Sequence, residues 1–394
     1  MGIPKLLART GAYFSAALVV IMAVSAWSAA TGRPEMLIPV YESVGTGGPN
    51  VYVVLLDGYP RADTLEETFA YSNASFLAEL EGLGFTVSEQ ARTNYRKTWL
   101  TLASMFNGAY VEDLLVSQAP EGDTATELRW LHVMLNEASL LDVLRERGYA
   151  IRTVPPPFTT AALTSADDYV DHGHLNEFEA KLVWSSPWEV FLREQVGAFL
   201  LDNQARLVAD ALETAASWAE SDDGNPQFVL AHVHSPHTPF ALHRPGTPVP
   251  DAPGCFPITC TLWHSTTEGM QIGFDEYRAG LLPQVAILND MTISAVQRIV
   301  AADPEGIVIV MSDHGARYSL FDPSEQFHSL LAARTPGADD LFADDESPVN
   351  LLRILYSSYF DAHLEPLPYR AWLGDWYTYL DLDPFEPDPR PITR

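Results

Sequence analysis

Basic residues and cysteine are the two scarce residue types in this chain of 394 residues. Lys and Arg number 23 against 52 Asp and Glu, so the formal net charge is -29. A surface this acidic repels phosphate backbones, which excludes a nucleic-acid-binding protein. With two cysteines, the chain cannot be a disulfide scaffold or a zinc module built from several cysteines.

Apolar residues, by contrast, are plentiful. Hydrophobic residues make up 47% of the chain and aromatic residues 11%, which is enough to bury a sizeable core and excludes wholesale disorder. The length predicts two or three domains, or one large α/β unit that takes up most of the chain. The composition is therefore that of a large, acidic, globular protein.

An uncharged apolar run near the N-terminus extends from Gly11 to Ala30. A helix of this length spans about 30 Å, the thickness of the hydrocarbon core of a bilayer. Lys5 and Arg9 precede it, so the positive-inside rule predicts that residues 1–10 are cytoplasmic and the rest is exported. The alternative is a signal peptide cleaved after the small residues 28–30. The length of the run favours a retained single-pass anchor in the cell membrane, and both interpretations put the bulk of the chain outside the cytoplasm.

The remainder divides into a linker, a folded domain and a tail. Residues 31–49 are rich in Gly and Pro and predict a linker. Residues 50–382 alternate short apolar runs with amphipathic helical patterns, and the Pro-rich residues 383–394 predict a flexible tail. The alternation predicts an α/β fold with a mainly parallel central sheet flanked by helices.

The expected elements follow from apolar runs and helical spacing. Strands are predicted at residues 51–56, 85–87, 149–154, 228–233 and 307–311. Helices are predicted at residues 73–83, 99–106, 140–147, 204–219 and 277–302.

Residues 244–268 predict a long loop, because they are rich in Pro and Gly and show no periodicity. Loops of that length are often functional, and this one is a hypothetical wall of a substrate pocket. Cys255 and Cys260 within it could form a disulfide in an oxidising compartment, or remain as two free, buried thiols.

Polar residues follow three of the predicted strands where each strand ends. Asp57 follows the first, His234 and His237 follow the strand at 228–233, and Asp313-His314 follows the strand at 307–311. Ligands of open α/β sheets bind beyond the carboxyl ends of the strands. Carboxylates and an imidazole suit a divalent cation, so the shared context predicts a common metal or anion site, although each motif alone is weak.

A similar motif at residues 171–174, Asp-His-Gly-His, lacks a preceding buried strand. We therefore interpret it as a surface loop, in preference to a metal site.

Thr98 is the nucleophile candidate, since it lies at the start of a predicted helix. Free backbone N–H groups and the helix dipole favour an anion there. The alternative is that Thr98 is an ordinary N-cap. Arg96 and Lys97 beside it add positive charge, or are solvated surface residues.

With these residues in place, the chain resembles the sulfatase-like branch of the alkaline phosphatase superfamily, which includes lipoteichoic-acid synthases and phosphoethanolamine transferases. The resemblance runs from about Asn50 to about Tyr369. It rests on segments that occur in family order, namely VYVVLLDGYPRAD, NYRKTWLTLASMFN, HVHSPHTPF, IVIVMSDHG and SPVNLLRILYSSYF.

The resemblance implies one catalytic divalent metal ion, which could be Mn, Mg, Zn or Ca. Carried over by motif, its ligands are Asp57, Thr98, Asp313 and His314. A second site that includes His328 is less favoured, because Phe327-His328-Ser329 more plausibly packs or caps.

The resemblance also implies residues that contact the substrate. His237, in the Pro-His-x-Pro stretch, matches a histidine that touches the substrate anion or leaving group, with His234 as a weaker neighbour. Arg61 and Lys97 on the same loops supply positive charge for an anionic substrate.

One departure from the family pattern concerns the nucleophile. Sulfatases use a Cys or Ser in a Cys/Ser-x-Pro-x-Arg signature, whereas Thr98 is followed by Trp99 and Leu100 and has no such Pro or Arg. The resemblance therefore implies an exported, membrane-anchored phosphotransferase or phosphodiesterase that acts on a phosphate ester, such as a lipid or glycan head group. A sulfatase and a catalytically degenerate envelope scaffold are the alternatives.

Overall fold

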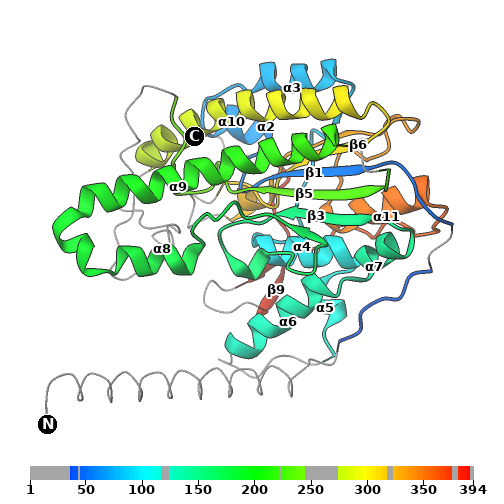
Figure 1. The fold of residues 1–394 in the computed structure, drawn as a ribbon. Helices are drawn as coiled ribbons and strands as arrows, with labels where there is room; N and C mark the ends of the chain where they lie inside the picture. The colour runs from blue at the N-terminus through cyan, green and yellow to red at the C-terminus, as the bar shows by residue number, and fades with distance from the viewer. Residues whose placement is uncertain are drawn as a thin grey trace, which may run out of the picture.

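Seven strands form a central sheet in the part of the chain that the computed structural model describes, with the order β2-β7-β6-β1-β5-β3-β4 (Figure 1). The strands are β1 (Val51–Leu56), β2 (Thr86–Val87), β3 (Ala150–Val154), β4 (Asp168–Tyr169), β5 (Gln227–Val233), β6 (Ile307–Met311) and β7 (Leu331–Arg334). The strands from β6 to β4 are parallel, and β7 and β2 are antiparallel to their neighbours. The predicted mainly parallel α/β fold is confirmed.

The structure describes residues 36–42, 45–116, 124–221, 224–244, 274–316, 323–374 and 380–390. The predicted anchor and the loop with Cys255 and Cys260 lie outside the described residues.

The position of β1 in the middle of the sheet explains why its sequence is a continuous apolar run. Tyr52, Val54 and Leu56 enter the hydrophobic core on one face of the sheet, and the alternate residues Val51 and Val53 enter the core on the other. A strand in the middle of a sheet covered on both faces needs apolar side chains at every position.

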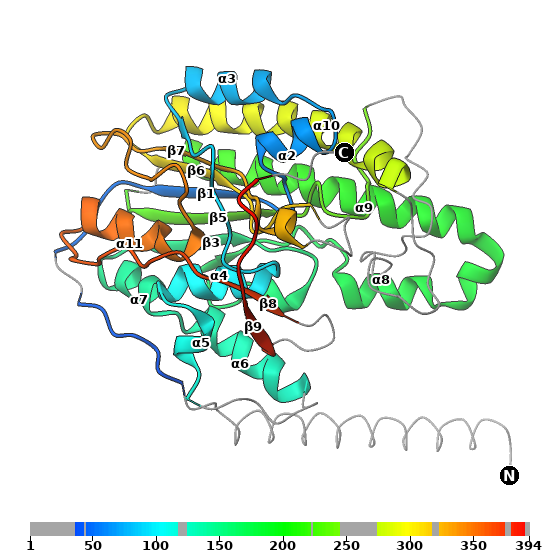
Figure 2. The ribbon, with the colours of Figure 1, turned by 180° about the vertical axis from the view of Figure 1, so that it is seen from behind.

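Helices cover both faces of the sheet (Figures 1 and 2). One layer contains α3 (Ala74–Gly82), α9 (Pro187–Glu220) and α10 (Phe274–Ala302). The other contains α4 (Thr98–Asn107), α7 (Ser139–Glu146) and α11 (Pro348–Tyr359), with α6 (Thr124–Asn136) packed on α4. Shorter elements are α2 (Ala62–Glu67), α5 (Val111–Leu114), α8 (Glu177–Trp184), η1 (Thr159–Ala161) and η3 (Ser324–Phe327).

Among the described helices, α10 is the one long and apolar enough to cross a membrane by length and composition. In this fold it packs against α9 and α3, and Leu281, Val285 and Leu288 are buried in the core. Its apolar character is accounted for by this packing.

The segment that the sequence assigned to a flexible tail begins with a strand. β9 (Leu382–Phe385) pairs antiparallel with β8 (Ala371–Gly374). The Phe385 ring stacks on Phe327 with centroids 5.3 Å apart, and Leu382 packs beside a buried cluster that includes Trp372. These apolar contacts order residues that the Pro-rich composition predicts to fray.

Candidate metal centre and active site

The site lies beyond the carboxyl ends of β6, β1 and β5. These strands are neighbours in the sheet and run parallel, so their carboxyl ends lie at the same edge of the sheet. Asp57 follows β1 directly, His234 follows β5, and Asp313 lies two residues after β6. Their backbones are joined, since His237 N–H donates to the Asp57 carbonyl at 3.0 Å. The Gly58 N–H donates to Asp313 Oδ1 at 3.0 Å.

The predicted metal ligands Asp57, Asp313 and His314 face one another. His314 Nε2 lies 3.4 Å from Asp57 Oδ1 and 3.5 Å from Asp313 Oδ2. His237, which the sequence predicted as catalytic, joins them: Asp57, His237 and His314 each offer a ligand atom within 4.8 Å of the others. Asp57, Asp313 and His314 are buried, and His237 is half-buried.

The donor set fits a divalent cation. Asp57 Oδ1, Asp313 Oδ2 and His314 Nε2 are buried without a hydrogen-bond partner among the described residues. His314 Nδ1 donates to the Gly315 carbonyl at 2.8 Å, so in the neutral ring the lone pair of Nε2 faces two carboxylates. Acceptors that face one another inside a protein need a positive charge between them, and oxygen and imidazole ligands suit several divalent metals.

The Asp57 carboxyl group has a lowered pKa although it is buried. Burial by itself would raise the pKa of its carboxyl group, but His237, His232 and His314 outweigh this effect and hold the pKa well below its ordinary value. The negative charge that a metal ion requires is therefore present in the folded chain.

His232 also lies in the candidate site, and the sequence analysis did not assign it. It is fully buried, and its Nε2 lies 3.2 Å from Asp57 Oδ2, the oxygen opposite the one that faces His314. It lies two residues before His234, and residues two apart on a strand share a face. That period-two spacing is the signal that could have identified it.

Two glycines of the site motifs permit its close packing. Gly58 has φ +73°, and a Cβ there would lie 3.1 Å from His314 Cε1. At Gly315 a Cβ would lie 2.2 Å from the Glu325 carbonyl oxygen and 2.5 Å from that of His328. Gly58 therefore allows the His314 ring to approach, and Gly315 allows the backbone of Glu325 and His328 to pack against the Asp-His-Gly loop.

A chain of polar contacts connects His237 to α9. Its Nδ1 donates to the Thr238 carbonyl at 2.7 Å and lies 3.2 Å from His234 Nε2. The Gln204 amide nitrogen of α9 lies 2.6 Å from His234 Nδ1. Since Nδ1 of His237 donates to a carbonyl, the Nε2 of the neutral ring is an acceptor, the form that can bind an ion or take up a proton.

Thr98 is the first residue of α4 and is 3% exposed. The N-cap is Lys97, and no side chain caps the helix, so Thr98 is not the ordinary N-cap of the alternative interpretation. One turn later, the Thr101 hydroxyl donates to the Asp313 carbonyl at 3.0 Å. The first turn of α4 is thus fastened to the loop that carries Asp313 and His314.

The predicted substrate-binding cations Arg61 and Lys97 are both buried. Arg61 is buried and makes a bidentate pair with Asp63, with both distances at 2.7 Å, and it donates to the Pro389 carbonyl. The Lys97 ammonium lies beside Gly374, whose carbonyl accepts a hydrogen bond from Arg96. The contacts of Arg61 are those of a residue that holds the C-terminal segment.

His328 is buried and forms hydrogen bonds within the protein, in keeping with the packing role that the sequence analysis favoured. Its Nε2 donates to the Asp388 carbonyl at 2.7 Å, and its Nδ1 lies 3.2 Å from the Thr64 hydroxyl. Burial, with Arg61 as the second cause, lowers its pKa to about 4. His328 is therefore neutral at physiological pH and is used for structure.

The motif at residues 171–174 is the surface loop that the sequence predicted. His172 is exposed and contacts the Thr214 hydroxyl, and His174 pairs with Asp210 at 2.7 Å.

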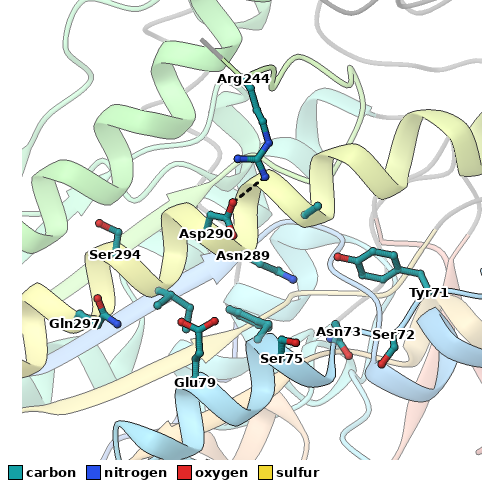
Figure 3. Close-up of a pocket in the computed structure, with 13 residues that line it drawn as sticks. Tyr71, Ser72, Asn73, Ser75, Glu79, Arg244, Asn289, Asp290, Ser294 and Gln297 are labelled. Carbon is teal, nitrogen blue, oxygen red and sulfur yellow. Dashed lines mark hydrogen bonds and ion pairs between the residues drawn. The ribbon is translucent and has the colours of Figure 1, made fainter. Parts of the chain in front are cut away.

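A separate cavity of about 410 Å³ lies between α3 and α10 (Figure 3). Asp290 on its wall pairs with Arg244 at 2.9 Å. Asn289, also on the wall, accepts a hydrogen bond from Tyr59 at 2.8 Å. The cavity is lined by the helical layer, and none of the predicted site residues lines it.

Comparison with known proteins bears on the fold. No protein-family model matches the chain, and no curated protein sequence matches it significantly. The C-terminal periplasmic domain of EcEptC from Escherichia coli is similar in structure, with a TM-score of 0.51 at 13% identity over 88% of this chain and 96% of that domain. The chain shares the fold of that domain. The zinc complex of the same domain gives the same TM-score and coverage at 14% identity.

Other structural neighbours belong to the group that the sequence resembles. The soluble domain of lipooligosaccharide phosphoethanolamine transferase A from Neisseria meningitidis has a TM-score of 0.45 at 13% identity, over 82% of this chain and 92% of that domain. Sulfatases and a protein of the alkaline phosphatase superfamily are also among the neighbours. The fold implied by the sequence resemblance is confirmed by the likeness to the EcEptC domain.

Proposed function

We propose that the chain is an exported, membrane-anchored, metal-dependent phosphotransferase or phosphodiesterase with Thr98 as its nucleophile. The observation that carries the proposal is the set of buried, unpartnered acceptors of Asp57, Asp313 and His314 beside the first turn of α4. The threonine nucleophile favours phosphoryl over sulfuryl transfer, since the Cys/Ser-x-Pro-x-Arg signature of sulfatases is not present at Thr98.

Asp57, Asp313 and His314 would hold one divalent ion, with Thr98 as a further ligand. Such an ion supplies charge stabilisation to a phosphoryl oxygen and acidifies a hydroxyl group. Thr98 Oγ1 releases its proton to water and attacks phosphorus in line while the ester bond to the leaving oxygen breaks, which gives a phosphothreonine. The N–H groups at the start of α4 stabilise the negative charge that develops on the phosphoryl oxygens.

His237 protonates the leaving oxygen in this scheme. It is half-buried, whereas Asp57 and His314 are buried, so it lies on the side of the cluster that an incoming ester would meet. Its Nδ1 is fixed by the Thr238 carbonyl, which directs Nε2 away from that carbonyl and gives the ring one orientation. Water or an acceptor hydroxyl then displaces Thr98 from phosphorus.

The test is the turnover of an aryl phosphodiester by the full chain, with the sulfate ester of the same aryl alcohol as the comparison. Thr98→Ala should lower turnover by at least about 10³-fold, whereas Thr98→Ser keeps a hydroxyl and should retain part of the activity. Mass spectrometry should find a phosphorylated Thr98 in the wild-type chain. Undiminished turnover in Thr98→Ala would reject the nucleophile, and faster turnover of the sulfate ester would reject phosphoryl transfer.

A further inference from the structure

Exposed apolar side chains are concentrated in one part of the molecule. Among the described residues, nine large hydrophobic side chains are exposed, and five of them fall within a stretch of 22 residues, 178–199. They are Phe178 (68% exposed), Leu182 (56%), Phe191 (80%), Leu192 (43%) and Phe199 (46%). Single exposed apolar residues are ordinary, but a group of them marks a surface that another apolar phase covers.

These residues belong to a helical hairpin, which we call the arm, formed by α8 and residues 187–201 of α9. Ala180 and Leu200 form its small buried core, with Trp184 and Val196 packed against them. The arm therefore has an apolar interior of its own and still presents Phe178 and the other four side chains outward.

The arm projects from the edge of the sheet that carries the candidate active site. Gln204 of α9 contacts His234, and α9 precedes β5 in the chain and runs back along it, so residues before Gln204 extend beyond the carboxyl ends of the strands. The N–H of Glu177 in α8 donates to the Pro157 carbonyl, just beyond β3. Both views of the ribbon show α8 and the beginning of α9 outside the sheet (Figures 1 and 2).

The apolar surface of the arm has the chemistry of a bilayer interface. Residues 182–188 and 195–201 contain no charged residue. Trp184 lies under the Arg193 guanidinium, which is 5.1 Å from its ring. A tryptophan beside a basic residue, with phenylalanines around them, is the composition found where helices meet lipid head groups.

The length of chain before the described residues favours lipid over a distant partner. Five residues, 31–35, separate the predicted anchor from Met36, and they reach about 18 Å when fully extended. Met36 is itself held to the folded domain by a bridge to Leu115. A retained anchor would therefore keep Met36, and the domain attached to it, within about 20 Å of the membrane surface.

We propose that the arm docks on the lipid bilayer through Phe178, Leu182, Phe191, Leu192 and Phe199, and thereby turns the active-site edge toward the membrane. The proposal rests on the membrane anchor of the proposed function, and it does not require that function to be phosphoryl transfer. The occupant of the apolar surface is the acyl-chain region just below the lipid head groups.

The test uses the full chain in vesicles of phosphatidylethanolamine and phosphatidylglycerol, with Cys255→Ser and Cys260→Ser as the background. A polarity-sensitive dye is attached at Phe191→Cys on the arm, or at the exposed control position Glu305→Cys before β6. Lipids brominated in the acyl chain should quench the dye at position 191 and leave position 305 unquenched. No quenching at 191, or equal quenching at both positions, overturns the proposal.

A second copy of the chain is the competing occupant. Energy transfer between donor- and acceptor-labelled chains at position 191, in the absence of quenching by the brominated lipids, overturns bilayer docking in favour of self-association. Because quenching needs no catalysis, it separates failure of this proposal from failure of the proposed function.

An activity measurement provides an independent test. The double variant Phe178→Ser, Phe191→Ser should lower turnover of a phosphodiester lipid in vesicles while turnover of a soluble aryl phosphodiester stays unchanged. Val40→Ser, at a 94% exposed position outside the arm, is the matched control and should change neither. An equal loss on both substrates, with the melting temperature retained, overturns the assignment of the arm to membrane docking.

Discussion

Asp57 and Asp313 are both buried and both face His314 Nε2. Burying charges without an opposite charge costs several kcal/mol, so the metal-free site opposes folding at this position. The ligands are held in place all the same, because Gly58 donates to Asp313 and His237 donates to the Asp57 carbonyl. Such an arrangement fits the divalent ion of the proposed function, because the side chains would need little rearrangement to bind it.

Asp313→Asn is therefore expected to stabilise the metal-free chain while it abolishes metal binding. The asparagine keeps an oxygen for the Gly58 N–H, and its amide nitrogen can donate to His314 Nε2, which removes a buried charge and two unpartnered acceptors. In chelator, the melting temperature of the variant should exceed that of the wild type. Addition of Zn²⁺ or Mn²⁺ should raise the melting temperature of the wild type alone. A lower melting temperature for the variant in chelator would contradict a cation site.

Glu112 provides a pH-dependent contribution to stability. Burial, as the largest cause, raises its pKa from 4.5 to about 7, although the Tyr95 hydroxyl donates to its carboxylate at 2.8 Å. The folded chain therefore holds a proton that the unfolded chain loses above pH 4.5. This contribution is fully present at low pH and is lost as the pH rises from about 4.5 to about 7.

Glu112→Gln mimics the protonated state, so its stability relative to wild type should increase with pH. The gain should be small at pH 5 and about 1–2 kcal/mol at pH 8. Urea unfolding of both proteins at the two pH values measures this difference, and it cancels the titration of all other groups. Glu137→Gln, at an exposed position in a turn after α6, is the surface control for the substitution itself. A difference that is constant with pH would contradict the raised pKa.

The sequence identified the candidate residues that follow strands and did not identify His232, which lies inside a strand beside Asp57. Asp57, Asp313 and His314 could be found because the carboxyl ends of parallel strands meet at one edge. His232 lies within β5, where a buried residue is expected to be structural. Arg61 looked available for a substrate anion, and its pairing with Asp63 depends on a side-chain conformation that no sequence pattern specifies.

At the scale of elements, strands with a continuous apolar run were predictable, and strands that depend on a partner for their extended form were not. β1 and β6 have the bounds that their apolar runs predict, because burial on both faces leaves a local signal. β7 and β9 have four residues each and owe their extended form to pairing with β6 and β8. The arm also lacked a signal, since exposed apolar residues disrupt the amphipathic pattern that predicts a helix.

The C-terminal segment after β9 is expected to stabilise the domain. Ending the chain after Phe385 would remove the Asp388 carbonyl that accepts from His328 and the Pro389 carbonyl that accepts from Arg61. Since both donors are largely buried, the loss should be about 1–3 kcal/mol for each donor left without a partner. Denaturant unfolding measures it, and Arg390→Ala, at an exposed side chain, is the control. An unchanged free energy of unfolding in the shortened chain would show that these contacts do not stabilise the domain.

At the scale of the whole molecule, the net charge is -29. Repulsion among the acidic side chains therefore lowers the stability of the folded state. Monovalent salt screens such charges over about 8–10 Å at physiological strength. The melting temperature in chelator should therefore rise between 20 and 300 mM NaCl, conditions set for this test. Sucrose at matched osmolality controls for solvent exclusion and should not reproduce the dependence on ionic strength. A fall with salt would indicate that attractive ion pairs dominate the charged surface.

The position of β1 in the sheet has a consequence for how the chain folds. β1 is synthesised before the other described strands, yet its hydrogen-bonding neighbours are β5 and β6. The contacts that close the site join Asp57 to His232 and Gly58 to Asp313 across 175 and 255 residues. Pairing across such separations makes folding slow, so a growing chain holds an unpaired, entirely apolar strand until most of the domain has been made. We expect its folding to depend on chaperones that bind extended apolar segments.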